Sequence, residues 1–495
     1  MSTSHQQLAR KVLDALRGSG ATSRPFRCFP LKAHHITPIS SSNHPPSPNE
    51  FHSHLLQLIR NAQHRVHLAS LYIGPAASAA ATEEHELLHA LTDLAAYRPH
   101  VEVKLLMDAN RALRPVMTTK HDKPTSSAEA VFKCIQARTP SSQFSGKPCL
   151  LYLFNPSPRL LVLPSPLNEV DGVFHIKCYI IDDNLILSGA NLSQEYFTDR
   201  QDRYTWFTNG GGGLVEFYVE LVNALCDYSH VYDGVVNSKK KRRDEKDRND
   251  LIQRVSNLMK GASNDCATVF STMDNNNDDP SVVAYAIPTF QSPSSLMSSS
   301  NDVVLTQNLI SSAAKEHLIL QLASAYLNPT RTLLQELAKL PNRHVQLLTA
   351  GPISHGFAPK HGLARKGDWV PQVFSTISKT LMQQQQYDVL WYSRPGWTFH
   401  AKGMWITSPN IQHSLVAAMV GSGNYGYRSW HRDVESNVIM VFPQMTSHVQ
   451  SSLQQEWKSL CHFADIAHFE QAAKNVLITS SSMIKASLPL IQRFF

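Results

Sequence analysis

The sequence lacks several features that would place it in a common class of protein. Its seven cysteines are odd in number and form no Cys-x-x-Cys pair, which argues against a disulfide framework or a zinc site and favours a reducing compartment. It has no run of about 18 or more apolar residues, so no membrane-spanning helix is predicted. The formal net charge of +7 favours an anionic partner, although a solvated surface explains it equally well.

Acidic residues are scarce at the start of the chain. The first 27 residues hold five lysines and arginines but only one acid, Asp14. Leu8, Val12 and Leu16 fall on one helical face, and prolines and serines are frequent in residues 38–49. An amphipathic, basic and acid-poor segment is typical of a mitochondrial transit peptide. We therefore predict a transit peptide and linker over residues 1–49, with an ordinary N-terminal helix as the alternative.

The remainder is too long for one core and divides into two similar halves. Predicted helices and strands alternate in the same order in both, and residues 68–72 and 322–326 agree at four of five positions. Residues 115–147 have the polar, irregular composition of a loop, and a second polar stretch lies between the halves. This order predicts an α/β fold made by duplication. The predicted boundaries are a first domain over 50–250, a linker over 251–280 and a second domain over 281–495.

A His-x-Lys stretch occurs once in each half, and each is followed by a turn of small residues, an asparagine, and a carboxylate eleven residues later. On a strand, a histidine and a lysine two residues apart point to the same side. A single His-x-Lys has little specificity, but two copies with the same trailing pattern are hard to attribute to chance. The recurring residues are His175, Lys177, Asn191 and Asp202 in the first half, and His400, Lys402, Asn424 and Glu435 in the second.

These residue types are sufficient for phosphoryl transfer without a metal or other cofactor. One histidine attacks phosphorus, and the other protonates the leaving oxygen and then deprotonates the acceptor. A carboxylate, here Asp202 or Glu435, can hold each imidazole by its far nitrogen. The lysines and asparagines supply donors for the phosphoryl oxygens, whose negative charge increases in the transition state.

At these residues the chain resembles the phospholipase D superfamily, whose signature is H-x-K-x4-D with a trailing G-S-x-N. The first copy keeps the aspartate, Asp182, whereas the second has Thr407 at that position. The first copy also has Ser188-Gly189 where Gly-Ser is usual. The resemblance implies two tandem α/β/α sandwich halves that share one active site at their interface. It further implies that His175 is the nucleophile, with Asp182 in a supporting role.

Within the superfamily, residues 69–74, 185–193 and 196–204 look like those of the eukaryotic mitochondrial phosphatidylglycerophosphate synthases. These enzymes transfer the phosphatidyl group of CDP-diacylglycerol to sn-glycerol 3-phosphate, release CMP and lead to cardiolipin. The resemblance implies those two substrates, no nucleic acid, and peripheral association with an anionic membrane on the matrix side of the mitochondrial inner membrane. Weaker candidates for binding the other phosphates are Arg111, Arg203, Arg428 and Arg432.

Three alternatives remain at the level of sequence. The same motifs serve phospholipase D-type hydrolases and nucleases, and they also serve other phosphatidyltransferases that make cardiolipin or phosphatidylserine. A non-catalytic lipid-binding protein is the third, if the second copy has decayed at Thr407. Two segments are candidates for membrane docking, the basic run 239–243 and the apolar C-terminal stretch 476–495. A solvated loop and ordinary core packing, respectively, are the alternatives for them.

Overall fold

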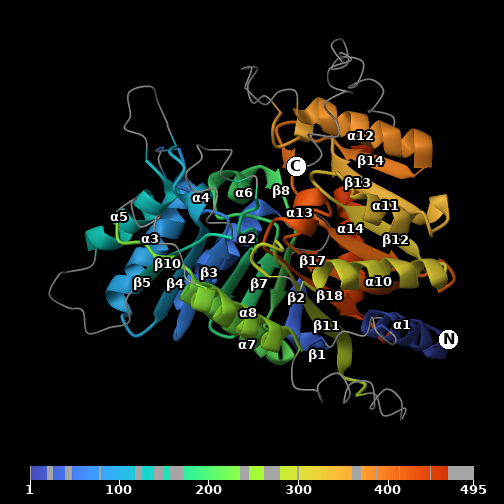
Figure 1. The fold of residues 1–495 in the computed structure, drawn as a ribbon, viewed down its shortest axis with the longest axis horizontal. Helices are drawn as coiled ribbons and strands as arrows, with labels where there is room; N and C mark the ends of the chain where they lie inside the picture. Colours follow the sequence, from blue (N-terminus) through green and yellow to red (C-terminus); the bar gives the residue numbers. More distant parts are fainter. Residues whose placement is uncertain are drawn as a thin grey trace.

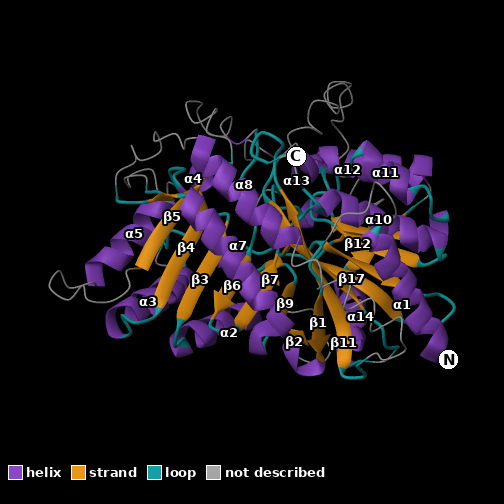
Figure 2. Ribbon diagram, turned by 60° about the horizontal axis from the view of Figure 1, so that its bottom comes forward, coloured by secondary structure: helices purple, strands orange, loops and turns teal. Residues whose placement is uncertain are grey.

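The computed structural model describes residues 2–18, 26–38, 47–116 without 77 and 79, 125–138, 149–156, 169, 171–234, 245–260, 279–358 without 298 and 299, and 370–465 without 386, 412 and 446. These residues form two large mixed sheets and the helices that cover them (Figures 1 and 2). The basic run 239–243 and the C-terminal stretch 476–495 lie outside the described residues.

The first sheet has the strand order β10-β5-β4-β3-β6-β7-β9-β2. Its central strands β3, β4 and β5 are parallel, and β6 runs antiparallel to β3. The bounds are β2 (Ile36–Pro38), β3 (Arg65–Ser70), β4 (Glu102–Asp108), β5 (Cys149–Phe154), β6 (Cys178–Ile181), β7 (Asn184–Ser188), β9 (Tyr204–Phe207) and β10 (His230–Val231).

The second sheet has the order β1-β11-β18-β17-β16-β12-β13-β14-β19 and repeats the central pattern. Strands β12, β13 and β14 are parallel, and β16 runs antiparallel to β12. The bounds are β1 (Phe29–Lys32), β11 (Val282–Gln291), β12 (Ile319–Ala323), β13 (Val345–Ala350), β14 (Asp388–Tyr392), β16 (Gly403–Thr407), β17 (Leu415–Gly421), β18 (Glu435–Val441) and β19 (Ala464–Asp465).

Helices form three layers around the two sheets. One apolar cluster joins α7, α8 and α14 to strands of both sheets, so these helices lie between them. Separate clusters cover the outer face of each sheet. The outer helices of the first sheet are α2 (Pro48–Asn61), α3 (Thr82–Tyr97) and α5 (Ser127–Arg138); those of the second are α1 (Ser2–Arg17), α10 (Asp302–Lys315), α11 (Arg331–Leu337) and α12 (Val370–Gln385); the central ones are α7 (Leu214–Tyr228), α8 (Glu245–Lys260) and α14 (His448–Cys461).

This arrangement confirms the predicted α/β fold with two duplicated halves. Local sequence signals place several of its elements. Helix α2, for example, begins at a capping box in which Ser47 Oγ accepts from the Glu50 amide at 3.1 Å, and Glu50 Oε2 accepts from the Ser47 amide at 3.0 Å. No helix in the described part of the chain is long and apolar enough to cross a membrane.

The N-terminal segment contributes to both halves. The apolar face of α1 is buried against α10 and the second sheet, with Val12 and Leu13 at 0% exposure. His5 contacts Ser414 Oγ at 3.0 Å and the carbonyl oxygen of Phe442 at 3.1 Å. Farther along, β1 pairs with β11 of the second sheet and β2 pairs with β9 of the first. The periodicity that predicted a transit peptide thus coincides with the core-facing side of a packed helix.

Two predicted irregular segments contain helices. Helix α5 lies within residues 115–147, which the composition predicted to be irregular. Helix α8 extends to Lys260 and so occupies the first ten residues of the predicted linker 251–280. Leu251, Val255 and Leu258 provide the apolar face of α8, which packs on α7. The spacing of these three residues is helical, but the many charges around them hide the pattern.

Candidate active site

The two His-x-Lys stretches meet at the interface between the halves, at the edge where the central parallel strands end (the site edge). His175 lies just before β6, and β6 is antiparallel to β3, so the histidine sits at the carboxyl end of β3 and β4. His400 lies just before β16 and occupies the equivalent place in the second half. The short elements α6 (Gln194–Thr198), β8 (Arg200–Gln201) and α13 (Tyr427–His431) come together here in the middle of Figure 1.

Each histidine receives its carboxylate from the opposite half. His175 Nδ1 lies 2.8 Å from Glu435 Oε1, and His400 Nδ1 lies 2.6 Å from Asp202 Oδ2. Both carboxylates have 0% exposure. The prediction that Asp202 and Glu435 lie beside the histidines therefore agrees with the geometry, while the exchange between halves was not predicted.

Backbone pairing across the interface fixes this exchange. Strand β15 (Thr398–Phe399) pairs in parallel with β8, and the His400 amide donates to the Gln201 carbonyl at 2.7 Å. In the other half, Phe174 bridges Val434 in parallel, and the His175 amide donates to the Val434 carbonyl at 2.8 Å. In both cases the histidine amide bonds the residue immediately before the carboxylate. The two halves are therefore related by an approximate twofold symmetry at the site.

The lysines lie deep beside the histidines, each with 1% exposure. Lys177 Nζ donates to the His175 carbonyl at 2.8 Å. Lys402 Nζ donates to the His400 carbonyl at 2.6 Å and lies 3.6 Å from Asp202 Oδ2. A Cβ atom on Gly189 would lie 2.3 Å from Lys402 Cδ, so only glycine allows this approach between the halves. That requirement explains one of the small residues that precede Asn191.

Burial determines the charge state of the site. Burial, followed by the nearby lysines, lowers the pKa of both imidazoles well below the usual value. Neutral imidazoles are what a nucleophile and a general base require. Burial also lowers the pKa of Lys402 to about 8 and raises the pKa of Glu435 to about 6. Because these two values bracket neutral pH, the lysine is charged and the carboxylate is ionised between them.

The two asparagines lie in equivalent places, but their contacts differ. Asn191 Nδ2 donates to the Tyr196 hydroxyl at 3.1 Å, and that hydroxyl lies 3.3 Å from His400 Nε2. In the second copy it is the backbone N–H of Asn424 that donates, to Ser429 Oγ at 2.9 Å. Each asparagine has a buried side-chain oxygen without a partner in the described part of the chain. The side-chain oxygen of each asparagine is therefore available to accept a hydrogen bond from a bound substrate.

Asp182 is not brought to the site. It lies in the β6–β7 turn with φ of 49°, at the other end of β6 from His175. Its carboxylate accepts from the amides of Gln63, His64 and Arg65 at 2.7–3.0 Å, so it fixes the start of β3. Thr407 likewise ends β16, paired with the first residue of β12. The loss of the aspartate in the second copy therefore leaves the reacting groups unchanged.

The four arginines predicted to bind phosphate are largely engaged with the protein. Arg203 is 3% exposed, makes a two-pronged ion pair with Glu456 and stacks on Trp405, so its guanidinium is engaged within the protein. Arg428 pairs with Asp433 at 2.9 Å. Arg432 lies over the ring of Tyr427, on the surface of α13. Arg111 is more available than Arg203 and Arg428, since its contact with Glu169 is long, 3.7 Å, and its side chain is 29% exposed, against 3% and 21%.

The sequence reasoning missed several residues that shape the site. Asp108 is fully buried and accepts from the amide of Phe174 at 2.8 Å, and burial raises its pKa to about 7. Asp433 accepts from the backbone amide of Val173 at 3.0 Å. Two carboxylates therefore hold the backbone immediately before His175. The rings of Tyr196 and Tyr326 stand edge-on to His400 at 5.1 and 5.9 Å. Tyr326 ends the Leu-Ala-Ser-x-Tyr repeat, which was a usable signal.

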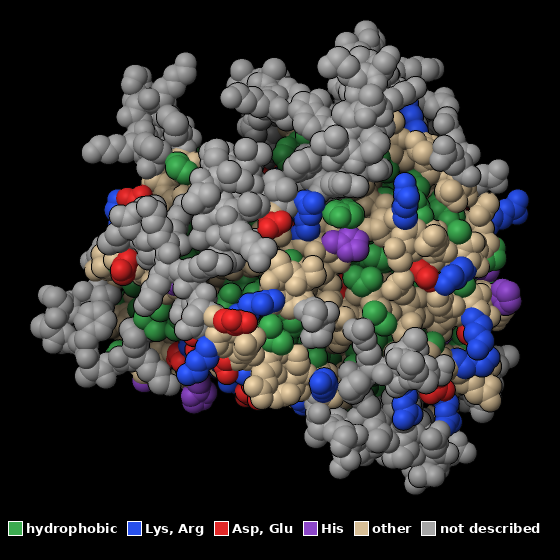
Figure 3. Space-filling model, in the orientation of Figure 1, with side chains coloured by type: hydrophobic (Ala, Val, Ile, Leu, Met, Phe, Trp, Pro, Cys, Tyr) green, Lys and Arg blue, Asp and Glu red, His purple; other side chains and the backbone are tan. Residues whose placement is uncertain are grey.

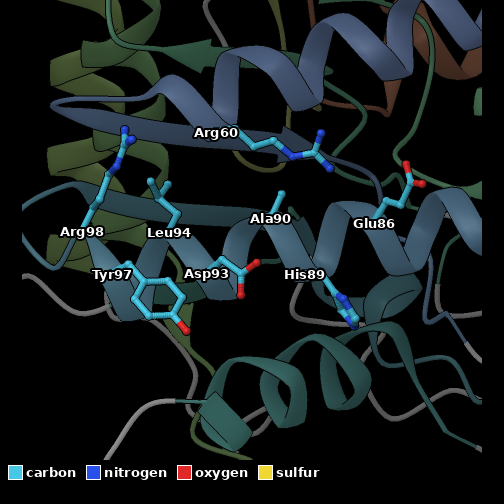
Figure 4. Close-up of a pocket in the computed structure, with 8 residues that line it drawn as sticks. All are labelled: Arg60, Glu86, His89, Ala90, Asp93, Leu94, Tyr97 and Arg98. Atoms are coloured by element: carbon cyan, nitrogen blue, oxygen red, sulfur yellow. The ribbon is translucent and has the colours of Figure 1, made fainter.

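A surface pocket of about 430 Å³ lies away from the site, between α2 and α3 (Figure 4). It contains none of the predicted site residues. The residues that line it are Arg60, Glu86, His89, Ala90, Asp93, Leu94, Tyr97 and Arg98.

Comparison with known families agrees with this geometry. The family model described as "Cardiolipin synthase, PLD-like domain" matches residues 55–209 and 307–457. Each match contains one histidine, lysine, asparagine and carboxylate of the site. The two matches cover more than half of the chain, which therefore belongs to this phospholipase D-like family.

Individual relatives are similar over most of their length. The chain is 29% identical to the Homo sapiens protein named "CDP-diacylglycerol--glycerol-3-phosphate 3-phosphatidyltransferase, mitochondrial", over 94% of this chain and 84% of that protein. It is 25% identical to the Saccharomyces cerevisiae "CDP-diacylglycerol--glycerol-3-phosphate 3-phosphatidyltransferase", over 84% and 80%. The crystal structure of phosphatidylserine synthase from Haemophilus influenzae Rd KW20 superposes with a TM-score of 0.68 at 19% identity, covering 98% of this chain and all of that one. This last likeness shows the fold.

Proposed function

We propose that this protein transfers the phosphatidyl group of CDP-diacylglycerol to sn-glycerol 3-phosphate, giving phosphatidylglycerophosphate and CMP on the route to cardiolipin. The observation that carries the proposal is the pair of buried histidines, each held by a carboxylate of the other half. The relatives named for this reaction span most of the chain, which favours it over the other reactions of the family.

In the first step, the lone pair of His175 Nε2 attacks the phosphorus that bears the diacylglycerol. The new P–N bond forms as the bond from phosphorus to the bridging oxygen breaks, and CMP leaves with that electron pair. CMP is a phosphate and a good leaving group, so it needs little help from an acid. The ammonium groups of Lys177 and Lys402 and the side-chain N–H groups of Asn191 and Asn424 stabilise the non-bridging oxygens.

In the second step, the 1-hydroxyl of glycerol 3-phosphate attacks the phosphohistidine. Its proton passes to His400 Nε2, the new O–P bond forms, and the electron pair of the P–N bond returns to His175. Asp202 stabilises the imidazolium that forms on His400. This division of roles is supported by the environment of the two rings. Nε2 of His175 has no hydrogen-bond partner in the described part of the chain, whereas Nε2 of His400 lies 3.3 Å from the Tyr196 hydroxyl and 3.4 Å from Lys402 Nζ.

Access to a lipid substrate suggests that the site edge docks on a membrane. Three of the five exposed large hydrophobic side chains in the described ranges lie in the segments that follow the equivalent strands β4 and β13, which end at this edge: Val116 (39% exposed), Ile353 (53%) and Phe357 (40%). Figure 3 shows basic, histidine and hydrophobic side chains close together over α13 as well. We include in the proposal peripheral docking here on an anionic bilayer, in the mitochondrion as for the named relatives, on the matrix side of the inner membrane.

Vesicle co-sedimentation tests the docking surface. The double variant Ile353→Ser/Phe357→Ser should bind anionic vesicles at least about fivefold more weakly. Each apolar side chain that becomes buried in the bilayer contributes at most about 1.5–3 kcal/mol to the free energy of binding. Tyr97→Ser is the control, because Tyr97 is 82% exposed but lies at the end of α3 away from the site edge. Equal binding by the double variant and the control would disprove this location.

The reaction is tested with CDP-diacylglycerol and labelled glycerol 3-phosphate, with the labelled lipid identified. Phosphatidylglycerophosphate is the expected product, and its absence would overturn the proposal. Phosphatidic acid at the same rate without glycerol 3-phosphate would indicate a hydrolase, and a lipid formed only with serine would indicate a phosphatidylserine synthase. His175→Ala and His400→Ala should each lower transfer by several orders of magnitude. Acid-labile label on the protein after incubation with the lipid alone tests the phosphohistidine.

A further inference from the structure

Tyr196 places a hydroxyl group on the reacting nitrogen of one histidine. The Tyr196 hydroxyl oxygen lies 3.3 Å from His400 Nε2 and accepts from Asn191 Nδ2 at 3.1 Å. The side chain is 2% exposed, and its ring stands at 81° to the imidazole, 5.1 Å away. The guanidinium of Arg200 lies over the same ring, 4.7 Å from its centre. The phenol is therefore held in place from three sides.

The direction of each hydrogen bond follows from its partners. His400 Nδ1 lies 2.6 Å from Asp202 Oδ2 and also 2.6 Å from Lys402 Nζ. Because an ionised carboxylate can only accept, we assign the Nδ1 proton to the contact with Asp202, so Nε2 carries the lone pair. Asn191 Nδ2 is a donor, so the phenol oxygen accepts there and its own proton points to Nε2. Burial raises the pKa of Tyr196 well above its usual value, which keeps this proton on the phenol at working pH.

The contact is found in only one of the two copies. Tyr196 lies five residues after Asn191, and the residue five after Asn424 is Ser429. Ser429 Oγ donates to Glu435 Oε1 at 2.9 Å, so the second copy places its hydroxyl on the carboxylate instead of the reacting nitrogen. A hydroxyl that served only to fill the core would not need to reach across the interface to Nε2. The difference between the copies thus marks the nitrogen that moves protons.

We propose that Tyr196 is a catalytic residue of the acceptor step, in which its hydroxyl donates a hydrogen bond to the 1-hydroxyl oxygen of glycerol 3-phosphate while His400 Nε2 removes the proton from that oxygen. This inference rests on the proposed function. The acceptor enters between the phenol and the imidazole and replaces their direct contact. As its proton moves to Nε2 and its O–P bond forms, the P–N bond to His175 breaks, and the phenol keeps its proton throughout. The O–H group of Tyr196 thereby stabilises the negative charge that develops on the attacking oxygen.

The test compares the two values of kcat/KM in Tyr196→Phe, which removes only the hydroxyl. In a two-step transfer, kcat/KM for CDP-diacylglycerol reports the first step, and kcat/KM for glycerol 3-phosphate reports the second. Loss of one preorganised donor predicts a fall of about 10- to 1,000-fold in the value for glycerol 3-phosphate. The value for CDP-diacylglycerol should change less than about threefold. The ratio of the two values does not depend on the fraction of folded enzyme.

Tyr204→Phe is the matched control, because Tyr204 is a buried tyrosine of the same half whose hydroxyl donates at 3.5 Å to the backbone carbonyl of Tyr196 and not to a reacting atom. It should leave the ratio unchanged. An unchanged ratio in Tyr196→Phe, or an equal fall of both values, would overturn the role of Tyr196. Failure of the proposed function would appear separately, as wild-type enzyme that makes no phosphatidylglycerophosphate.

Discussion

Asp202 of the first half accepts a hydrogen bond from His400 of the second at 2.6 Å, and this contact makes the site a property of both halves together. Glu435 and His175 form the reciprocal contact at 2.8 Å. Neither histidine is oriented by its own copy of the motif. A half expressed alone would therefore carry a histidine and a lysine but would lack the carboxylate of the other half, which sets the tautomer of that histidine.

The crossed pairing is tested by Asp202→Asn and Glu435→Gln. Each should lower kcat by about 10²–10⁴, because an amide no longer favours the imidazole form with the proton on Nδ1. A double-mutant cycle identifies the partner. Asp202→Asn should add little to His400→Ala, since the two act as a unit. Strong coupling of Asp202 to His175 instead of to His400 would contradict the geometry.

Gly189→Ala should impair the site through Lys402. The added methyl would meet Lys402 Cδ at 2.3 Å and Asp202 Oδ1 at 2.6 Å, and both groups are buried. We expect a loss of at least about tenfold in kcat/KM, the effect of a small displacement of positioning groups. The neighbouring change Ala190→Gly removes a methyl group and should have a smaller effect. Full activity in Gly189→Ala would show that the close approach is not needed.

The activity should depend on pH through two buried groups. Below about 6 the Glu435 carboxylate takes up a proton and no longer holds His175, because burial has raised its pKa to about 6. Above about 8 Lys402 loses its charge, because burial has lowered its pKa to about 8. The rate should therefore be greatest between these values. An alkaline limb near 10.5, the usual lysine value, would be the contrary result.

Lys402→Arg provides the control for the alkaline limb. A guanidinium stays protonated over this range, so whatever activity the variant retains should not fall near pH 8. An unchanged alkaline limb in this variant would assign the titration to another group.

Arg203→Met should act on stability. The Arg203 guanidinium bonds both oxygens of Glu456, and breaking one partner of a buried ion pair costs about 3–5 kcal/mol. We expect a lower denaturation midpoint, with KM for glycerol 3-phosphate little changed in the folded fraction. A selective increase in that KM, at unchanged stability, would instead support the phosphate-binding role that the sequence suggested.

Helix α1 should be part of the stable fold. Leu13 is fully buried against the second half, so Leu13→Ala should lower the free energy of unfolding by roughly 2–5 kcal/mol. Asp14→Ala, on the exposed face of the same helix, is the control. Denaturant unfolding measures both. Equal stability of the two variants would indicate that the packing of α1 contributes little.

The sequence by itself determined the duplication, the α/β class and the eight residues that recur at the site, since short motifs and the periods of strands and helices depend only on local spacing. It could not show that Asp202 serves His400, because that contact joins residues 198 positions apart. For the same reason the sequence could not show that the charged groups of Arg203 and Asp182 are engaged by distant side-chain and backbone atoms.

The tertiary structure alone decided the asymmetry between the copies. In the sequence, nothing distinguishes Tyr196 from the other residues of the five-residue segment that forms helix α6. Only the pairing of β8 with β15 brings it across the interface to His400 Nε2, while Ser429 at the equivalent place meets Glu435. A motif records which chemical groups are present, but which nitrogen has a hydroxyl beside it depends on how the two halves pack.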